Sequence, residues 1–515
     1  MSVTYSSTRG EESQKGLDFR TVVMTGLAHD RGLFVPDTLP EVSKEELESW
    51  RSLSYPELAV KVIAKFVKED QVPLDVLTDI VTRSCGAFRS EDVTPVVEVG
   101  GHTILELFHG PTFAFKDVAL QMLGNFFEYF LSTGSNGGRL TVLGATSGDT
   151  GSAAIYGLRG KKGVDCVILF PNGRVSEIQE RQMTTVPDSN IHCVAVEGTF
   201  DDCQDLVKAS FNDKAFRDRV KLGAVNSINW CRVLAQTTYY YWSYMRVTDK
   251  HPDVSEVSFS VPTGNFGDIL AGYYAKQMGL PVGKLIVATN ENDILHRFFS
   301  KGEYHREAIA HTISPSMDIC VSSNFERYLF HLAGNDSAKL SKWMKDFETT
   351  RKLTVSGDLL KQAQSDFLSA RCDTKETLRV IKQYNDESGY VLCPHAATGV
   401  SAIHQLKEVV PSMVCLATAH EAKFPAAVKR AVDPLPTPPI QLSELFHKET
   451  RRSECPNDLK VVQAFVEKKI AIRMAEDAAA TKSSGSGLEK QLKRTVVVAA
   501  IIGAIAVGMQ AYKRR

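Results

Sequence analysis

The segment 109–117 contains a lysine that could act as an amine nucleophile. Lys116 lies among Phe113, Phe115 and Val118. Partial burial among such apolar side chains lowers the pKa of an amine, and a neutral amine can form a Schiff base with an aldehyde. The pattern also suits a lysine at a helix start whose amine extends from an aromatic surface to water, and the spacing by itself favours this second interpretation. The first interpretation becomes specific only together with other motifs.

Two glycine-rich loops could each hold an anion. The loop 261–268 follows an expected strand and opens a helix expected at 269–276, so its backbone amides could approach a phosphate. It matches neither the dinucleotide nor the nucleoside-triphosphate motif, and a plain strand–helix turn is the alternative. The loop 145–152 carries many hydroxyl groups, which suit a carboxylate or a phosphate. Helix capping by Ser147 or Asp149 explains only a part of this composition.

A third segment, 226–232, offers an amide, a hydroxyl and a guanidinium in close succession. Arg232 could bind a phosphate through two parallel hydrogen bonds. An arginine at this distance from an asparagine is usually a surface residue, so this segment gains weight only beside the others.

The hydrophobic pattern predicts the scaffold for these segments. Residues 1–93 form a small, mostly helical unit, with helical spacing at 45–50 and 58–67 and an extended piece at 33–36. From residue 94, apolar strands alternate with helices, which predicts parallel β/α crossovers with ligands at the C-terminal ends of the strands. The expected strands are 140–143, 166–170, 257–261 and 285–288, and a further helix is expected at 153–158.

Composition excludes several classes of protein. The 515 residues carry 60 Lys+Arg and 61 Asp+Glu, a formal net charge of -1, so no general basic field would attract nucleic acid. The 10 cysteines are scattered without a C-x-x-C pair, which indicates free thiols and no metal site. The N-terminus lacks the apolar stretch of a secretory signal, and a cytoplasmic main body is expected.

The C-terminal region differs from the rest. Residues 456–489 are expected to form a helix and a linker: 471–490 is rich in Ala, Ser, Gly and charge, and 483–487 is typical of a flexible linker. Residues 495–512 contain no charged residue and would span about 27 Å as a helix, with basic residues on both sides. This favours a tail anchor in a mitochondrial outer or peroxisomal membrane; a docked apolar helix is the alternative.

Taken together, these segments resemble threonine synthase of the long fungal-type branch, within the fold-type II group of pyridoxal-phosphate enzymes. The resemblance covers roughly residues 3–455 and includes N-terminal signatures at 5–10 and 32–36 and a middle signature at 317–319 with 322–327. It implies an α/β fold with two open twisted β/α lobes at 94–455 and a small helical N-terminal domain at 1–93. The apolar helix within 490–515 is appended to this fold and lies outside the resemblance.

The resemblance also implies residue roles. Lys116 would hold pyridoxal 5'-phosphate, and Thr418 would bind the pyridine nitrogen. Some family members have Asn at the position of Asp149, and the segment 394–399 departs from the usual pattern and receives no catalytic role. The cofactor phosphate would be lined by Gly264, Asn265, Phe266, Gly267 and Asp268; the substrate carboxylate and its neighbours by Thr146, Ser147, Asp149 and Thr150; and the substrate phosphate by Asn226, Ser227 and Arg232.

The activity implied is conversion of O-phospho-L-homoserine and water into L-threonine and phosphate, by β,γ-elimination and replacement, in a monomer or homodimer. Two alternatives stay open: a phospholyase that releases 2-oxobutyrate, and a membrane-tethered homologue that has lost catalysis. The product formed from phosphohomoserine would distinguish the first of these from the synthase.

Overall fold

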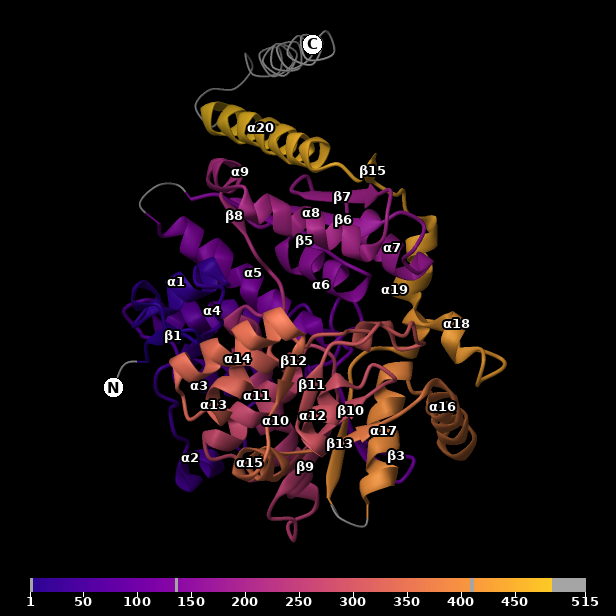
Figure 1. Cartoon of the computed structure of the whole chain (residues 1–515). Coiled ribbons are helices and arrows are strands. Elements are labelled where there is room, and N and C mark those ends of the chain that lie inside the picture. The colour runs from indigo at the N-terminus through magenta and orange to yellow at the C-terminus, as the bar shows by residue number, and fades with distance from the viewer. Residues whose placement is uncertain (1–2, 135–137, 408–411, 484–515) are drawn as a thin grey trace.

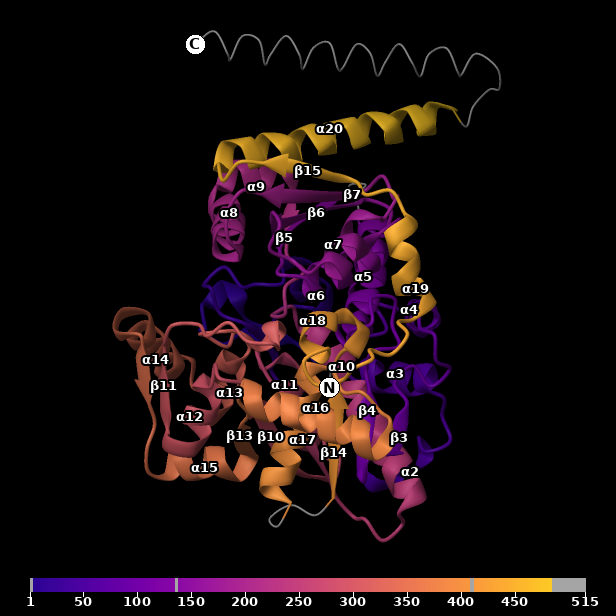
Figure 2. The ribbon, with the colours of Figure 1, turned by 90° about the vertical axis from the view of Figure 1, so that its right-hand side faces the viewer.

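Two open β-sheets form the two lobes of the structure, a computed structural model that describes residues 3–134, 138–407 and 412–483. The larger sheet has the strand order β13-β10-β9-β14-β4-β3, and the smaller has the order β15-β7-β6-β5-β8. Figure 1 and Figure 2 show the smaller sheet in the upper half of the molecule and the larger one below it, with helices around both. The predicted α/β class with two β/α lobes is confirmed.

The larger sheet is parallel except at one edge. The strands predicted at 257–261 and 285–288 are present as β9 (Val257–Pro262) and β10 (Val282–Thr289). The edge pair departs from the predicted parallel scheme, because Gly100 and Gly101 join β3 to β4 in a tight antiparallel turn. The other strands are β3 (Val96–Val99), β4 (His102–Glu106), β13 (Phe367–Arg371) and β14 (Met413–Ala417).

The smaller sheet is parallel throughout. The strands predicted at 140–143 and 166–170 lie within β5 (Leu140–Ala145) and β6 (Val164–Pro171), and the helix predicted at 153–158 lies within α6 (Asp149–Leu158). The chain returns to this sheet after leaving the larger lobe, since the late strand β15 pairs with β7. The remaining strands are β7 (Ile191–Val196), β8 (Leu222–Gly223) and β15 (Arg452–Cys455).

The N-terminal unit shares one continuous apolar core with the helices between the lobes. Helices occur near both predicted segments, as α2 (Lys44–Ser49) and α3 (Tyr55–Ala64), and the second ends earlier than its apolar pattern. Glu57 closes a capping box with Ser54, which fixes the start of α3. The other elements of the unit are β1 (Tyr5–Ser7), β2 (Phe34–Pro36), α1 (Phe19–Thr25) and α4 (Leu74–Cys85).

Helix α5 (Lys116–Ser132) packs backbone to backbone against α6. A Cβ atom on Gly124 would lie 2.0 Å from the carbonyl oxygen of Gly157, and one on Gly157 would lie 2.3 Å from that of Leu120. Only glycine permits this approach. The two contact glycines lie equally far along their helices, so the helices begin side by side, and Lys116 and Asp149 are their first residues.

The remaining helices surround these sheets. Two of them, α8 (Phe200–Asn212) and α9 (Lys214–Val220), belong to the smaller lobe and contact α20. The helices that carry residues discussed below are α7 (Glu177–Thr184), α10 (Trp230–Lys250), α11 (Gly267–Gln277), α12 (Ile294–Lys301), α13 (Phe325–Leu332) and α17 (Pro394–Leu406). Farther out are α14 (Ser337–Thr350), α15 (Asp358–Asp366), α16 (Thr374–Ser388), α18 (Pro425–Val428), α19 (Ile440–Ser443) and the short hairpin β11 (Glu303–His305) with β12 (Lys352–Thr354).

The C-terminal helix α20 (Leu459–Ser483) lies across the outside of the smaller lobe (Figure 2). It continues past residue 471, where the composition changes, because Ala is a strong helix former and Arg473 pairs with Asp477 at 3.6 Å one turn on. The predicted linker beyond Ser483 and the apolar segment 495–512 lie outside the described residues. In the part of the chain that the structure describes, no helix is long and apolar enough to cross a bilayer.

Candidate functional site

The predicted lysine is buried at the start of α5, and its exposed fraction is 8%. The Phe115 amide donates to the carbonyl of Thr418 at 2.8 Å, and Ala114 forms a β-bridge with Ala419. These contacts hold Lys116 beside Thr418, which follows β14 directly. The predicted desolvation is confirmed: burial lowers the pKa of the Lys116 amine below its usual value.

Asp149, at the start of α6, is the acidic partner of this amine. One carboxylate oxygen of Asp149 lies 3.6 Å from Lys116 Nζ, and the other lies 2.6 Å from Lys423 Nζ. Burial alone would raise the pKa of Asp149, but the charges of Lys423 and Lys116 outweigh it and hold the pKa well below its usual range. Gln179 Nε2 and Ser316 Oγ complete its contacts, at 2.9 and 3.0 Å.

Arg232, in the first turn of α10, is a buried cation with few partners. Its Nη1 donates to the carbonyl of Val225 at 3.1 Å, and its Nε has no hydrogen-bond partner in the described part of the chain. Burial lowers the pKa of its guanidinium to about 10, and its charge in turn acts to lower the pKa of Lys116. A buried guanidinium without a carboxylate is costly unless an anion binds to it.

The loop 263–268 joins β9 to α11 as the sequence predicted. Phe266 has a left-handed backbone with φ of 62°, and a Cβ atom on Gly264 would lie 2.9 Å from the carbonyl of Ser316. Ser323 Oγ lies 3.2 Å from both Ser227 Oγ and Asn265 Oδ1. It therefore connects two residues that were predicted to bind different phosphates.

Asp268 turns its side chain away from this loop toward α10. One carboxyl oxygen accepts hydrogen bonds from Tyr239 at 2.5 Å and Tyr240 at 3.0 Å. Burial raises the pKa of Asp268 to about 6. Its backbone amide, in the first turn of α11, is the part that remains suited to an anion.

The hydroxyl-rich loop before α6 is organised by Thr146. Its Oγ1 accepts hydrogen bonds from the amides of Gly148 and Gly151, at 3.0 and 2.8 Å. This hydroxyl is therefore used within the fold, as a cap of the helix. Ser147 and Asn226 are exposed, and Thr150 is half-buried.

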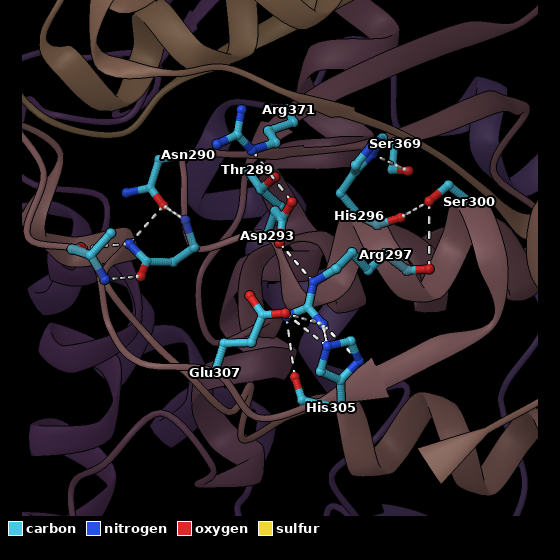
Figure 3. A network of polar contacts seen from close by, with 12 residues as sticks. Thr289, Asn290, Asp293, His296, Arg297, Ser300, His305, Glu307, Ser369 and Arg371 are labelled. Atoms are coloured by element: carbon cyan, nitrogen blue, oxygen red, sulfur yellow. Dashed lines mark hydrogen bonds and ion pairs between the residues drawn. The ribbon is translucent and has the colours of Figure 1, made fainter. Parts of the chain in front are cut away.

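A polar network beside the larger sheet joins α12 to the chain around β11 (Figure 3). The segment that carries Ser316 follows β11 along the chain. Arg297 pairs with Asp293 at 2.8 Å and with Glu307 at 3.3 Å, which fixes the chain just after β11. Farther along the segment, Asp318 accepts hydrogen bonds from the Nδ2 groups of Asn290 and Asn292, at 2.8 and 3.1 Å. These anchors bring Ser316 over the site.

Four residues at this site were missed from the sequence: Gln179, Ser316, His395 and Lys423. His395 lies in the segment 394–399, to which the sequence assigned no role; its Nε2 accepts from the Ser316 amide at 3.2 Å, and burial lowers its pKa to about 4. Lys423 is completely buried. A lone lysine or histidine carries no signal of its own, so only the fold reveals these contacts.

The arrangement fits an aldehyde cofactor that bears a phosphate. Lys116 offers a buried amine, the start of α11 offers amides, and Arg232 is a buried cation with an unpartnered donor. The two-lobed fold with a buried lysine at a helix start defines a fold-type II pyridoxal-phosphate enzyme.

Comparisons with known proteins lead to the family. The model of the threonine synthase N terminus matches residues 4–85, that of pyridoxal-phosphate dependent enzymes matches 93–342, and that of the threonine synthase C-terminal region matches 396–466. The threonine synthases of Schizosaccharomyces pombe and Saccharomyces cerevisiae are each 49% identical, over 84% of this chain and 89% of theirs. A crystal structure of pyridoxal-phosphate-bound threonine synthase from Brucella melitensis superposes with a TM-score of 0.87 at 44% identity, covering 91% of this chain and 99% of that one.

The chain belongs to the threonine synthase family, and its cofactor is pyridoxal phosphate. The predicted enzyme class, a pyridoxal-phosphate-dependent lyase, is therefore confirmed.

Proposed function

We propose that this enzyme converts O-phospho-L-homoserine and water into L-threonine and phosphate. The observation that carries the proposal is the position of two buried cationic side chains: Lys423 pairs with Asp149 beside the Lys116 amine, and Arg232, which acts electrostatically on Lys116, has an Nε without a hydrogen-bond partner among the described residues. Such a site is suited to ligands with two phosphates, one on the cofactor and one on the substrate.

The cofactor would be held between the lobes. Lys116 would bind its aldehyde, the amides at 264–268 would bind its phosphate at the start of α11, and Thr418 would face its pyridine nitrogen. When bound, the cofactor supplies an electron sink for the carbon atoms next to the substrate amine. The hydroxyl of Thr418 is neutral and offers no charged partner to that nitrogen, which suits elimination and replacement.

The substrate would be oriented by the two anion loops. Ser147 and Thr150, with the start of α6, would bind its carboxylate, while Asn226, Ser227 and Arg232 would bind its phosphate. Asp149 is an ionised carboxylate between two lysines, so it would repel a second carboxylate; we assign it to the lysines instead. The lowered pKa of Lys116 favours the unprotonated amine, which could act as the base that removes a proton from the substrate.

A product assay on purified full-length protein tests this proposal. Phosphohomoserine should yield threonine and phosphate in equal amounts. Release of 2-oxobutyrate and ammonia without threonine would instead establish the phospholyase. Borohydride reduction followed by peptide mass spectrometry should place the cofactor on Lys116, and a protein that binds no cofactor would be the non-catalytic homologue.

For the location of the enzyme, we propose a cytoplasmic catalytic domain anchored by residues 495–512. The uncharged length of this segment and its basic flanks support the proposal. Full-length protein should pellet with membranes, and a form that ends at Ser483 should stay in the supernatant. Equal partition of the two forms would contradict the anchor.

A further inference from the structure

A second buried lysine shares the acidic partner of Lys116. Lys423 ends the short 3-10 helix η3 (Glu421–Lys423), and its side chain is completely buried. Its Nζ donates to Asp149 Oδ1 at 2.6 Å and to the carbonyl of Thr112 at 2.8 Å. The roles proposed above use Lys116 and leave Lys423 without one.

The two oxygens of Asp149 have different partners. Oδ1 accepts from Lys423 and from Gln179, whereas Oδ2 accepts from Ser316 and lies 3.6 Å from Lys116 Nζ. Lys423 therefore occupies the close pairing position, and Lys116 lies beyond hydrogen-bond distance from the same carboxylate. An ammonium at Lys116 would share a counter-ion that is already paired.

We propose that Lys423 is a positioning residue: by pairing with Asp149 it fixes this carboxylate beside Lys116 and keeps it from acting as a full counter-ion, so that the Lys116 amine loses its proton at a lower pH than it would with Asp149 as its own partner. This inference rests on the proposed role of Lys116 as the cofactor lysine. It concerns the charge state of that amine, which can be measured without the reaction.

The charges around Lys116 set the expected sign. The neighbouring cations oppose a proton on Lys116, and the carboxylates favour one. Removal of Lys423 takes away one repelling charge and frees Asp149, and both changes favour protonation of Lys116. The groups that act electrostatically with Lys116 are Asp149 on α6, Arg232 on α10, Asp268 on α11, His395 on α17 and Lys423 on η3.

A purely structural role for Lys423 is the alternative. Its contact with the Thr112 carbonyl connects η3 to the segment before α5, and loss of that contact alone would loosen the site. Such loosening would lower stability and activity but would give no directed change in the protonation of Lys116. The experiment must therefore measure the pH at which Lys116 is half-protonated.

The experiment compares Lys423→Met with wild type and with Lys429→Met, which removes an exposed lysine from the same segment. Acetic anhydride labels unprotonated amines, so full-length protein is labelled before cofactor is added, over a range of pH, and Lys116 is quantified by mass spectrometry. The pH midpoint of labelling should rise by about one unit or more in Lys423→Met. In the holoenzyme, the pH midpoint of the visible absorbance of the bound cofactor should rise in the same variant. Lys429→Met should leave both unchanged.

Asp149→Asn should shift the pH midpoint of Lys116 in the opposite direction, because it removes the counter-ion and leaves Lys423 and Arg232 in place. The pH midpoint of Lys116 labelling should fall in this variant. It therefore tests the proposed electrostatic coupling even if Lys423→Met fails to fold. An unchanged or lower midpoint in folded Lys423→Met, or an unchanged or higher one in Asp149→Asn, would overturn the proposal. Borohydride reduction of the wild-type enzyme distinguishes failure of this proposal from failure of the proposed function. If the cofactor is trapped on Lys116, only the role of Lys423 is in question; if it is trapped on another lysine, the proposed function itself fails.

Discussion

Two buried arginines, which lie in two different regions of the molecule, differ in the number of hydrogen bonds that their guanidinium groups make. Arg327, at the seam between the N-terminal unit and the larger lobe, donates to the carbonyls of Phe34 and Ile228 at 2.9 and 2.7 Å and to Asn324 Oδ1. The side chain of Arg232, at the lysine site, makes one hydrogen bond within the described part of the chain, to the carbonyl of Val225. Burial lowers the pKa of each to about 10, so both are desolvated to a similar degree.

The two arginines differ in whether the protein itself supplies acceptors for their guanidinium N–H groups. At the seam, the chain itself supplies an acceptor for each nitrogen of Arg327, as is usual for a buried polar group. At the lysine site, Arg232 Nε has no hydrogen-bond partner among the described residues, and Lys116 shares a carboxylate with Lys423. Unmatched buried charge is unfavourable for folding, so where it persists it indicates a ligand that completes it.

The largest effect expected from this comparison is on catalysis, at the site alone. Lys116→Met should lower the rate of product formation by at least about 10³-fold, because it removes both the amine that binds the cofactor and the base. The midpoint of urea unfolding should change little, since a buried amine is replaced by an apolar side chain of similar length. The exposed Lys162→Met is the control, and product formation in Lys116→Met within tenfold of wild type would remove the lysine from the mechanism.

Arg327→Met should show the reverse, a loss of stability. It leaves two carbonyls and an amide oxygen without a donor in the interior, and we expect a destabilisation of about 3 kcal/mol. Urea unfolding followed by circular dichroism measures it. Once folded, the variant should keep its affinity for substrate. Exposed Arg430→Met serves as the matched control, and equal midpoints for the two variants would mean that the seam does not depend on Arg327.

Arg232→Met tests whether this arginine, unlike Arg327, serves substrate binding and not stability. The free energy of unfolding should change little, because the substitution removes the hydrogen bond to Val225 and, at the same time, a buried charge that no carboxylate pairs with among the described residues. The KM for phosphohomoserine should rise about 10- to 100-fold, because a charge-assisted contact with its phosphate is lost. Steady-state kinetics and the unfolding midpoint together check this. A destabilisation as large as that of Arg327→Met, with KM unchanged, would show that Arg232 is structural.

The sequence predicted the strands, helices and candidate site residues that depend on local patterns of residue type. Strand–turn–helix repeats located β9, α11, β5 and α6. Lys116 was singled out by its apolar neighbours and Arg232 by the polar groups of its segment, and the resemblance to threonine synthase implied their roles. The antiparallel edge at β3 was missed, because the tight turn between β3 and β4 is a local feature that the hydrophobic pattern does not record.

The missed site residues share one cause. Asp149 contacts Lys423, which lies far away along the chain, and Ser316 reaches the site only because its segment is anchored beside the larger sheet. The side chain of Asp268 shows the same limit, since its motif predicted a phosphate loop but not its hydrogen bonds to Tyr239 and Tyr240. Pairings across elements follow from topology, which a single sequence leaves open.

The smallest expected effect concerns Asp268, a buried acid that lies at the site and is incompletely paired like Arg232, because its Oδ2 has no partner in the described part of the chain. Its pKa of about 6 in the folded state exceeds the value of about 3.9 in an unfolded chain. The folded protein therefore binds more protons between these pH values, and the stability that Asp268 contributes below about pH 4 is lost as the pH rises through about 6.

Asp268→Asn removes this loss, because the amide oxygen can still accept from Tyr239 and Tyr240 but cannot ionise. Relative to wild type, the unfolding free energy of the variant should therefore improve by about 2 kcal/mol between pH 4 and pH 7. Urea unfolding at both pH values, with cofactor at saturation, measures the difference. Contributions from other titrating groups such as Asp117 and His395 cancel in it, and exposed Asp346→Asn should show no change. A difference that stays constant with pH would mean that Asp268 remains ionised when buried, with its charge balanced by the cations at the site.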